Sequence, residues 1–174
     1  QSPPQLRGDR AEAVDRGPVL ASLTVQLASP SAKERVMAIA YACLHAAPAL
    51  LPALRQALTE DRDAGVRAEA ARALGLFGDA AVFDVLHERL KALPEPPPAN
   101  TRGKAKKELL DAFGAYDGLV RMGDIRSLPT LVALGEGGRW SAWISKLGES
   151  SNVPDALVRQ YPFGLAGLAE LGLS

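Results

Sequence analysis

The chain has 174 residues, 47% of them apolar, and its 20 basic side chains balance its 20 acidic side chains. This length and apolar content indicate one globular domain or a short repeat array, and they exclude a mainly disordered chain. The neutral charge argues against a nucleic-acid-binding protein, which carries a basic patch, and no apolar run is long enough to span a membrane. Aromatic residues make up only 5%, while Ala, Leu and Arg are frequent, which favours helices.

The chain begins with a polar segment, residues 1–17, which we expect to be flexible because it contains Pro3 and Pro4. Gln1 stands where a newly made protein has Met. Such a start is expected of an exported, periplasmic protein after removal of its signal peptide or of a boundary within a longer chain, and a cytoplasmic protein is the alternative. The apolar stretch 18–28 follows, and its spacing predicts an amphipathic helix at this end of the domain.

Residues 31–60 and 61–93 form two similar units that are related by a shift of 32 positions. The shift aligns Ser31 with Asp63, and both are residue types that cap helix N-termini. It also aligns apolar positions, Leu44 with Leu76, Leu54 with Leu86, and Leu58 with Leu90. Each unit therefore predicts an antiparallel pair of helices, at about 32–46 and 48–59, and at about 64–77 and 80–92.

The most regular stretch of the second unit is VRAEAARALGLFGD, from Val66 to Asp79. Its apolar residues recur at helical spacing and predict one buried face, formed by Val66, Ala70, Leu74 and Phe77. Gly78 suits the left-handed turn that ends a helix, and Asp79 suits the N-cap of the next helix. The stretch contains no nucleophile and no pair of metal ligands, so it predicts a structural unit.

A third unit, residues 102–135, follows an insertion. A shift of 45 positions aligns Gly78 with Gly123 and Asp79 with Asp124, so the Gly-Asp turn recurs. The insertion is the Pro-rich segment 94–101, which we expect to be extended and exposed because proline interrupts helices.

Residues 61–90, DRDAGVRAEAARALGLFGDAAVFDVLHERL, resemble a HEAT repeat of the bacterial phycobilin-lyase-like type. In that type an Asp and a Val-Arg pair precede an Ala-rich helix, a Gly-Asp turn and a helix with spaced Leu. Residues 31–58 and 104–134 resemble it less closely, and residues 137–174 differ from it. The resemblance implies partner binding rather than an enzymatic activity.

The same resemblance implies an all-α fold, a short right-handed α-solenoid (a HEAT-like superhelix) of about three to four stacked antiparallel helix pairs. We expect one domain, residues 18–174, because a single helix pair cannot bury its own apolar face. The divergent segment 137–174 is expected to be a C-terminal cap. Stacked second helices are expected to form a concave face.

Five residues are candidates for contact with a protein partner: Arg55, His87, Arg139, Trp140 and Trp143. Arg55 aligns with His87, and we expect both on the exposed side of the concave face. Trp140 and Trp143 are three positions apart on one helical face with Arg139 beside them, and Trp and Arg dominate binding hot spots. The alternative for the two Trp residues is a place in the core.

No catalytic, metal or cofactor site is predicted. His45 and His87 are the only histidines and do not form a zinc-binding motif, and Cys43 has no second thiol. For Arg67 and Asp79 we expect structural contacts with the backbone or the neighbouring repeat. The basic run 102–107 is interpreted as a solvated first turn of a helix.

The sequence therefore predicts a non-catalytic protein–protein interaction scaffold without a cofactor. The alternative is a nucleic-acid-binding or DNA-repair protein of the HEAT-like DNA glycosylase kind, in which Arg139, Trp140 and Trp143 would contact DNA. The neutral charge opposes this alternative, because phosphate contacts supply much of the affinity for nucleic acids.

Overall fold

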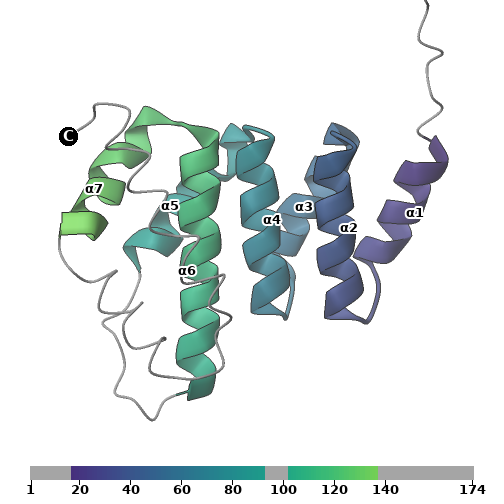
Figure 1. Ribbon diagram of the computed structural model, residues 1–174, viewed down its shortest axis with the longest axis horizontal. Helices are drawn as coiled ribbons and strands as arrows, with labels where there is room; N and C mark the ends of the chain where they lie inside the picture. The colour runs from purple at the N-terminus through teal and green to yellow at the C-terminus, as the bar shows by residue number, and fades with distance from the viewer. Residues whose placement is uncertain (1–16, 93–101, 137–174) are drawn as a thin grey trace, which may run out of the picture.

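The computed structural model describes residues 17–92 and 102–136, and every regular element in these ranges is helical (Figure 1). The predicted all-α class is therefore confirmed. The Pro-rich insertion 94–101, the C-terminal cap 137–174 and all but Gly17 of the predicted N-terminal segment lie outside the described residues.

The chain forms a first helix, α1 (Gly17–Leu27), and then three pairs of helices. The pairs are α2 (Ala32–Leu44) with α3 (Leu51–Glu60), α4 (Ala64–Leu76) with α5 (Phe83–Lys91), and α6 (Arg102–Met122) with α7 (Leu128–Glu136). A short 3-10 helix precedes each second helix: η1 (Pro48–Leu50), η2 (Ala80–Val82) and η3 (Ile125–Ser127). The predicted helices within these ranges begin and end close to the observed ones.

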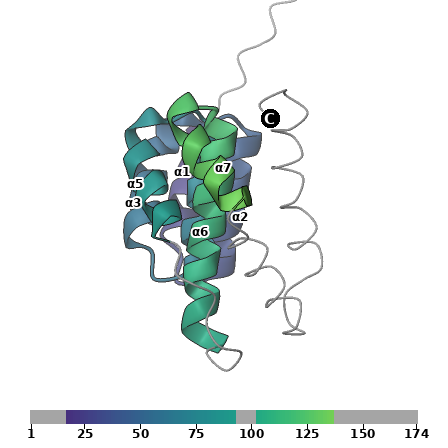
Figure 2. The same ribbon diagram turned by 90° about the vertical axis from the view of Figure 1, so that its left-hand side faces the viewer.

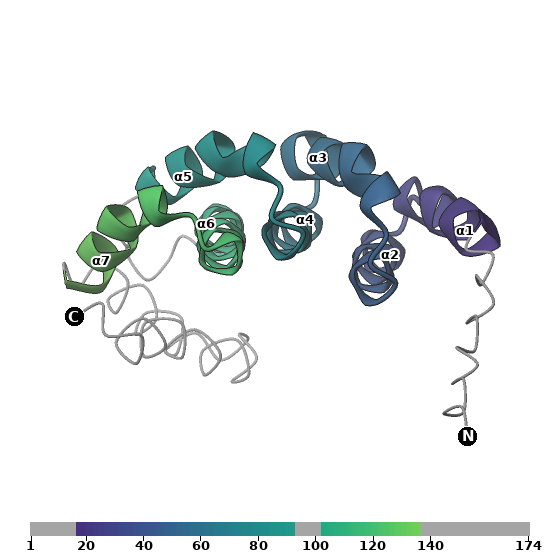
Figure 3. The ribbon, with the colours of Figure 1, turned by 90° about the horizontal axis from the view of Figure 1, so that it is seen from above.

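The helices form two rows along an arc. Figure 3 shows the first helices α2, α4 and α6 on the inner side of the arc, and α1, α3, α5 and α7 on the outer side. Figure 2, seen from the α7 end, shows α3 and α5 on one side and α2 and α6 on the other. The expectation that second helices form the concave face is therefore wrong. The first helices pack directly on one another, with α4 in contact with both α2 and α6, and this close packing places them on the shorter, inner side.

Each first helix is connected to its second helix by a turn whose backbone is set by one residue. Gly78 and Gly123 both have a φ of 66°, the left-handed conformation that glycine adopts without steric penalty. At the equivalent position of the first unit, Ala46 has a φ of 45°. The carboxylates of Asp79 and Asp124 accept hydrogen bonds from the backbone N–H groups of Ala81 and Arg126, so both predicted caps are confirmed.

The core repeats with the sequence. The leucines of the second helices are buried at equivalent positions: Leu54, Leu86 and Leu131 in one set and Leu58 and Leu90 in another. Ser31 and Asp63 cap α2 and α4 as predicted, each accepting a hydrogen bond from the first turn of its helix. Residues at equivalent positions of the repeats therefore have the same structural role, as a helix cap or as a buried leucine.

Among the described helices, α4 and α6 make the most extensive contact with one another. A Cβ atom at Gly75 would lie 2.1 Å from the Gly118 backbone oxygen, and one at Gly114 would lie 2.5 Å from the Ala68 Cα atom. A Cβ atom at Gly118 would lie 2.6 Å from the Ala71 backbone oxygen. Small residues on both helices therefore let the two backbones approach closely, as interior packing density requires.

Candidate partner-binding surface

Ion pairs connect successive repeats near the connections that lead from the second helix of one pair to the first helix of the next. Arg35 of α2 binds Asp61 through two hydrogen bonds, from Nε at 2.7 Å and from Nη2 at 2.8 Å. Its remaining nitrogen donates to the backbone oxygens of Ser29 and Pro30. Both side chains are almost fully buried, and the hydrogen bonds to Asp61 raise the pKa of the Arg35 guanidinium. Such a bidentate pair holds one repeat against the next.

Arg67 repeats this arrangement in the next unit. Its Nε donates to Asp111 of α6 at 2.8 Å, and its Nη1 donates to the Asp61 backbone oxygen at 2.8 Å. These are contacts with backbone and with the neighbouring repeat, which the sequence analysis expected for Arg67. All three donor groups of the guanidinium are engaged within the protein, so Arg67 has a structural role.

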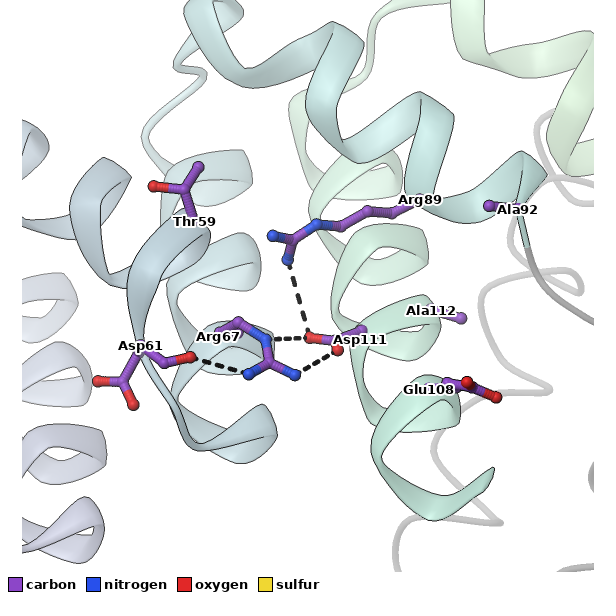
Figure 4. Close-up of a pocket in the computed structure, with 8 residues that line it drawn as sticks. All are labelled: Thr59, Asp61, Arg67, Arg89, Ala92, Glu108, Asp111 and Ala112. Atoms are coloured by element: carbon purple, nitrogen blue, oxygen red, sulfur yellow. Dashed lines mark hydrogen bonds and ion pairs between the residues drawn. The ribbon is translucent and has the colours of Figure 1, made fainter. Parts of the chain in front are cut away.

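A shallow hollow of about 450 Å³ lies beside this pair (Figure 4). Its charged lining comes from Asp61, Arg67, Arg89, Glu108 and Asp111. Arg89 donates to the Leu58 backbone oxygen at 2.7 Å and lies 3.8 Å from Asp111, and burial lowers the pKa of its guanidinium. Because acidic and basic side chains already contact one another here, we interpret the hollow as part of the junction between repeats and not as a ligand site.

Arg55, a predicted contact residue, lies on the outer row and not on the concave side. Its Nε and Nη2 bind the two carboxylate oxygens of Asp79 at 2.6 and 2.8 Å. This hydrogen bonding lowers the pKa of Asp79 and raises the pKa of Arg55. Arg55 therefore bridges α3 to the Gly-Asp turn of the next unit, while part of its side chain stays exposed.

His87 occupies the position equivalent to Arg55, but it makes different contacts. Its Nε2 atom lies 2.7 Å from the Thr130 hydroxyl of α7, and its ring packs 5.2 Å from the Phe83 ring. Asp124, which is equivalent to Asp79, binds Arg126 of its own turn instead. Arg126 in turn stacks over Phe83 at 4.0 Å. His87 therefore joins the second and third units, and its role in partner binding stays a prediction.

Arg139, Trp140 and Trp143 lie outside the described residues, so their contribution also stays a prediction. Helix α6 begins at Arg102, at the start of the predicted basic run, and Lys107 is exposed on its surface. The side chains of residues 102–106 lie outside the described ones, so the solvated first turn stays a prediction.

On the inner row, α4 and α6 present a group of charged side chains that neutralise one another. Arg72 forms ion pairs with Glu69 at 3.0 Å and with Asp117 at 2.6 Å, and Arg121 forms one with Asp117 at 3.0 Å. The group combines both signs of charge and does not form the basic stripe expected of a nucleic-acid interface.

Helix α2 presents an apolar surface instead. Met37 and Tyr41 are each 44% exposed, and Leu44 is 78% exposed. Leu76, which aligns with Leu44, is also exposed at the end of α4. The spacing of 37, 41 and 44 places these side chains on one face of α2, away from the buried Ala38, Ile39 and Ala42. The sequence analysis did not single out this face, because it interpreted apolar residues at helical spacing as core.

The HEAT repeats family model matches residues 20–109 of the chain. Together with the stacked helix pairs, this match shows that the chain belongs to the HEAT repeat family, as the resemblance predicted. The phycobilin-lyase-like subtype stays a prediction. No curated protein and no solved structure matches the chain.

Within the described ranges, no helix is long and apolar enough to cross a membrane. The same residues contain no group of three or more His, Cys, Asp or Glu side chains that could hold a metal ion. Cys43 is partly buried, and burial is the main cause of the raised pKa of its thiol. A raised thiol pKa disfavours the reactive thiolate, so the geometry offers no support for a cysteine nucleophile.

Proposed function

We propose that the chain is a non-catalytic protein–protein interaction scaffold that binds its partner through the inner row of helices. One observation carries the proposal: exposed apolar side chains lie on the first helices of this row, while the charged side chains of α4 and α6 on the same row pair with one another. Met37, Tyr41, Leu44 and Leu76 form this apolar part. Contiguous exposed apolar surface with a polar border is typical of protein interaction sites.

The proposal is tested by isolating proteins that bind the full chain in its native host and repeating each interaction with purified components. We expect a saturable complex that is weakened at least tenfold by the double variant Leu44→Lys and Leu76→Lys. Ile125→Lys, at an exposed residue of the turn before α7, serves as the matched change that leaves binding intact, and Arg55→Ala and His87→Ala test the predicted contacts on the outer row. Trp140→Ala and Trp143→Ala test the other sequence-based candidates in the same assay. A purified chain that forms no complex with any recovered protein would refute the scaffold function.

The nucleic-acid alternative is tested separately with duplex DNA at low salt, where phosphate contacts are strongest. We expect no binding, because the described inner face mixes acidic and basic side chains. Binding that weakens steeply as salt rises would favour the alternative.

A further inference from the structure

Helix α6 is buried around its whole circumference along its central turns. Residues 112–116 are all buried, and because successive residues of an α-helix lie about 100° apart, these five sample every side of it. The equivalent residues of α4, 67–71, include three that are only half-buried, and those of α2, 35–39, include the exposed Met37. The last described helix of the inner row is therefore better covered than the two that precede it (Figure 3).

The repeat shows which side of α6 a following first helix would contact. In α4, the side that faces the next first helix carries Ala68, Ala71 and Gly75, which all lie close to glycines of α6. The shift of 45 positions aligns them with three residues of α6, which we call its distal face: Phe113, Tyr116 and Val120. Among the described residues no first helix follows α6, so the repeat leaves a place for one beside the distal face.

The distal face is apolar, and two of its side chains are shielded from water. Phe113 is 5% exposed and Tyr116 is 3% exposed, and burial raises the pKa of the Tyr116 phenol to about 12. Among the described helices, the extensive contacts of α6 are with α4 and α5, and α4 lies on the side of Gly114 and Gly118. In α4 the equivalent side is buried by the first helix that follows, which indicates that a following element covers the distal face as well.

The chain continues after α7 with a sequence that suits this place. Residues 28–31 connect α1 to α2 and residues 61–63 connect α3 to α4, so three or four residues separate a second helix from the next first helix. The longer connection before α6 contains the Pro-rich insertion. Since α7 ends at Glu136, the same spacing starts another first helix at residue 140 or 141. From there, large apolar residues recur at helical spacing: Trp140, Trp143, Ile144 and Leu147.

We propose that residues 140–147 form a further first helix that packs against the distal face of α6, with Trp140 and Trp143 in the contact. The two Trp side chains then belong to the core of the repeat array and not to a partner-binding surface. This inference does not depend on the scaffold function, but it narrows it. The inner row offers a partner the apolar side chains of α2 and α4, while the C-terminal segment occupies the last position of the row.

A partner protein or a second copy of the chain would compete with this segment for the distal face. The segment follows α7 after a few residues, so its effective concentration at the distal face is far above that of a separate chain. A face that contains Phe113 and Tyr116 would also be a large apolar patch if it stayed uncovered until a partner arrived. Both arguments favour the segment, and fluorescence distinguishes the three occupants.

Trp140 and Trp143 are the only tryptophans of the chain, so the intrinsic fluorescence of the full chain reports on this segment alone. We expect emission at a shorter wavelength, and several-fold weaker quenching by acrylamide, than from the chain unfolded in urea. Val120→Asp places a charge on the half-buried edge of the distal face and is expected to shift the emission toward the unfolded value. Val85→Asp, at an exposed valine of α5, is the matched control and is expected to leave the emission unchanged. Wild-type emission equal to that of the unfolded chain would overturn the inference.

A spin label tests the position of the segment without altering the distal face. In a Cys43→Ala background, a nitroxide is attached to Arg121→Cys, at an exposed residue next to Val120, or to Gln56→Cys, at an exposed residue of α3. A nitroxide quenches tryptophan only at short range, so we expect strong quenching from position 121, little from position 56, and no change on dilution. Equal quenching from the two positions would contradict the proposed contact. Quenching from position 121 that disappears on dilution would assign the distal face to a second copy instead.

The scaffold function is tested by complex formation and this inference by the isolated chain, so the two can fail separately. Tryptophans that are accessible to acrylamide in the free chain and become shielded when a native partner is added would overturn the inference and leave the scaffold function standing. A chain that shows the expected fluorescence but forms no complex with any recovered protein would keep the inference and refute the scaffold function.

Discussion

The junction between α2 and α4 and the junction between α4 and α6 connect equivalent first helices with different side chains. Where α2 has Val36, Ile39 and Cys43, α4 has the smaller Ala68, Ala71 and Gly75 at the same repeat positions. The contact between α4 and α6 is also the more extensive of the two. A repeat can therefore change the distance between its inner helices while its second helices keep the same buried leucines.

The ion pairs at the two junctions differ for a related reason. Asp61 lies in the loop before α4, but the equivalent position 106 lies within the longer helix α6 and is a lysine. Arg67 therefore binds Asp111, further along that helix. The first pair is almost fully buried, whereas the second is partly exposed and has Arg89 nearby. The comparison indicates that the first junction depends more strongly on its single ion pair.

The largest expected effect follows from this difference. Arg35→Met keeps the aliphatic part of the side chain but leaves the buried Asp61 carboxylate without its partner. We expect the free energy of unfolding to fall by about 3 kcal/mol, the usual penalty for breaking a buried pair. The measurement is urea denaturation followed by far-UV circular dichroism.

Arg67→Met is the matched change at the second junction. Asp111 keeps Arg89 nearby and is more accessible to water, so we expect a smaller loss of about 1 kcal/mol. Equal losses for the two variants would contradict the difference between the junctions.

The close approach of α4 and α6 predicts an unusual result for a glycine inside a helix. Replacing such a glycine by alanine ordinarily stabilises a helix by up to about 1 kcal/mol. At Gly75 the new methyl group meets the Gly118 backbone, which cannot move without shifting α6. We expect Gly75→Ala to lower the free energy of unfolding by about 2 kcal/mol, as overpacking does.

Cys43 is the equivalent residue of α2 and provides the control for Gly75. Cys43→Ala removes a small, partly buried group, and we expect a loss of about 1 kcal/mol or less. An increase in melting temperature for Gly75→Ala would show that the two inner helices are not in tight contact.

The helices and turns could be predicted from the sequence because their signals are local. The spacing of Val66, Ala70 and Leu74 determines one buried face, and a glycine followed by an aspartate determines each turn. Ala46 is the exception: it adopts the left-handed turn with no local signal, because the flanking helices of the repeat impose that backbone.

The arrangement of the helices could not be predicted to the same extent. Which row lies inside the arc depends on how closely α4 approaches α6, and this depends on pairs of small residues that are distant in sequence. The sequence likewise did not show that two residues at equivalent positions make different contacts, Arg55 with Asp79 and His87 with Thr130. The apolar face of α2 was missed because the sequence does not show which helical face stays uncovered, and among the described residues no first helix precedes α2 to cover Met37 and Tyr41.

The smallest expected effect concerns acid stability and the two turn aspartates. Arg55 lowers the pKa of Asp79 through its hydrogen bonds, and Arg126 lowers the pKa of Asp124 to about 2 in the same way. A carboxyl group with a pKa below its unfolded value near 3.8 stabilises the fold above that pH. This stabilisation is lost as the pH falls through the folded-state value. We therefore expect the free energy of unfolding to decrease from just below pH 4 toward pH 2.

Two variants show which turn contributes to this decrease. Asp79→Asn and Asp124→Asn each remove one titrating group, so each is expected to make the decrease shallower between pH 4 and pH 2. The expected result differs for removal of the basic partners. Arg55→Met is expected to reduce the part of the acid dependence that comes from Asp79, whose turn is bridged to the preceding repeat. Arg126→Met is expected to reduce the part that comes from Asp124, whose ion pair lies within a single turn. If both arginine variants left the acid dependence unchanged, their hydrogen bonds would not be the cause of the lowered pKa values.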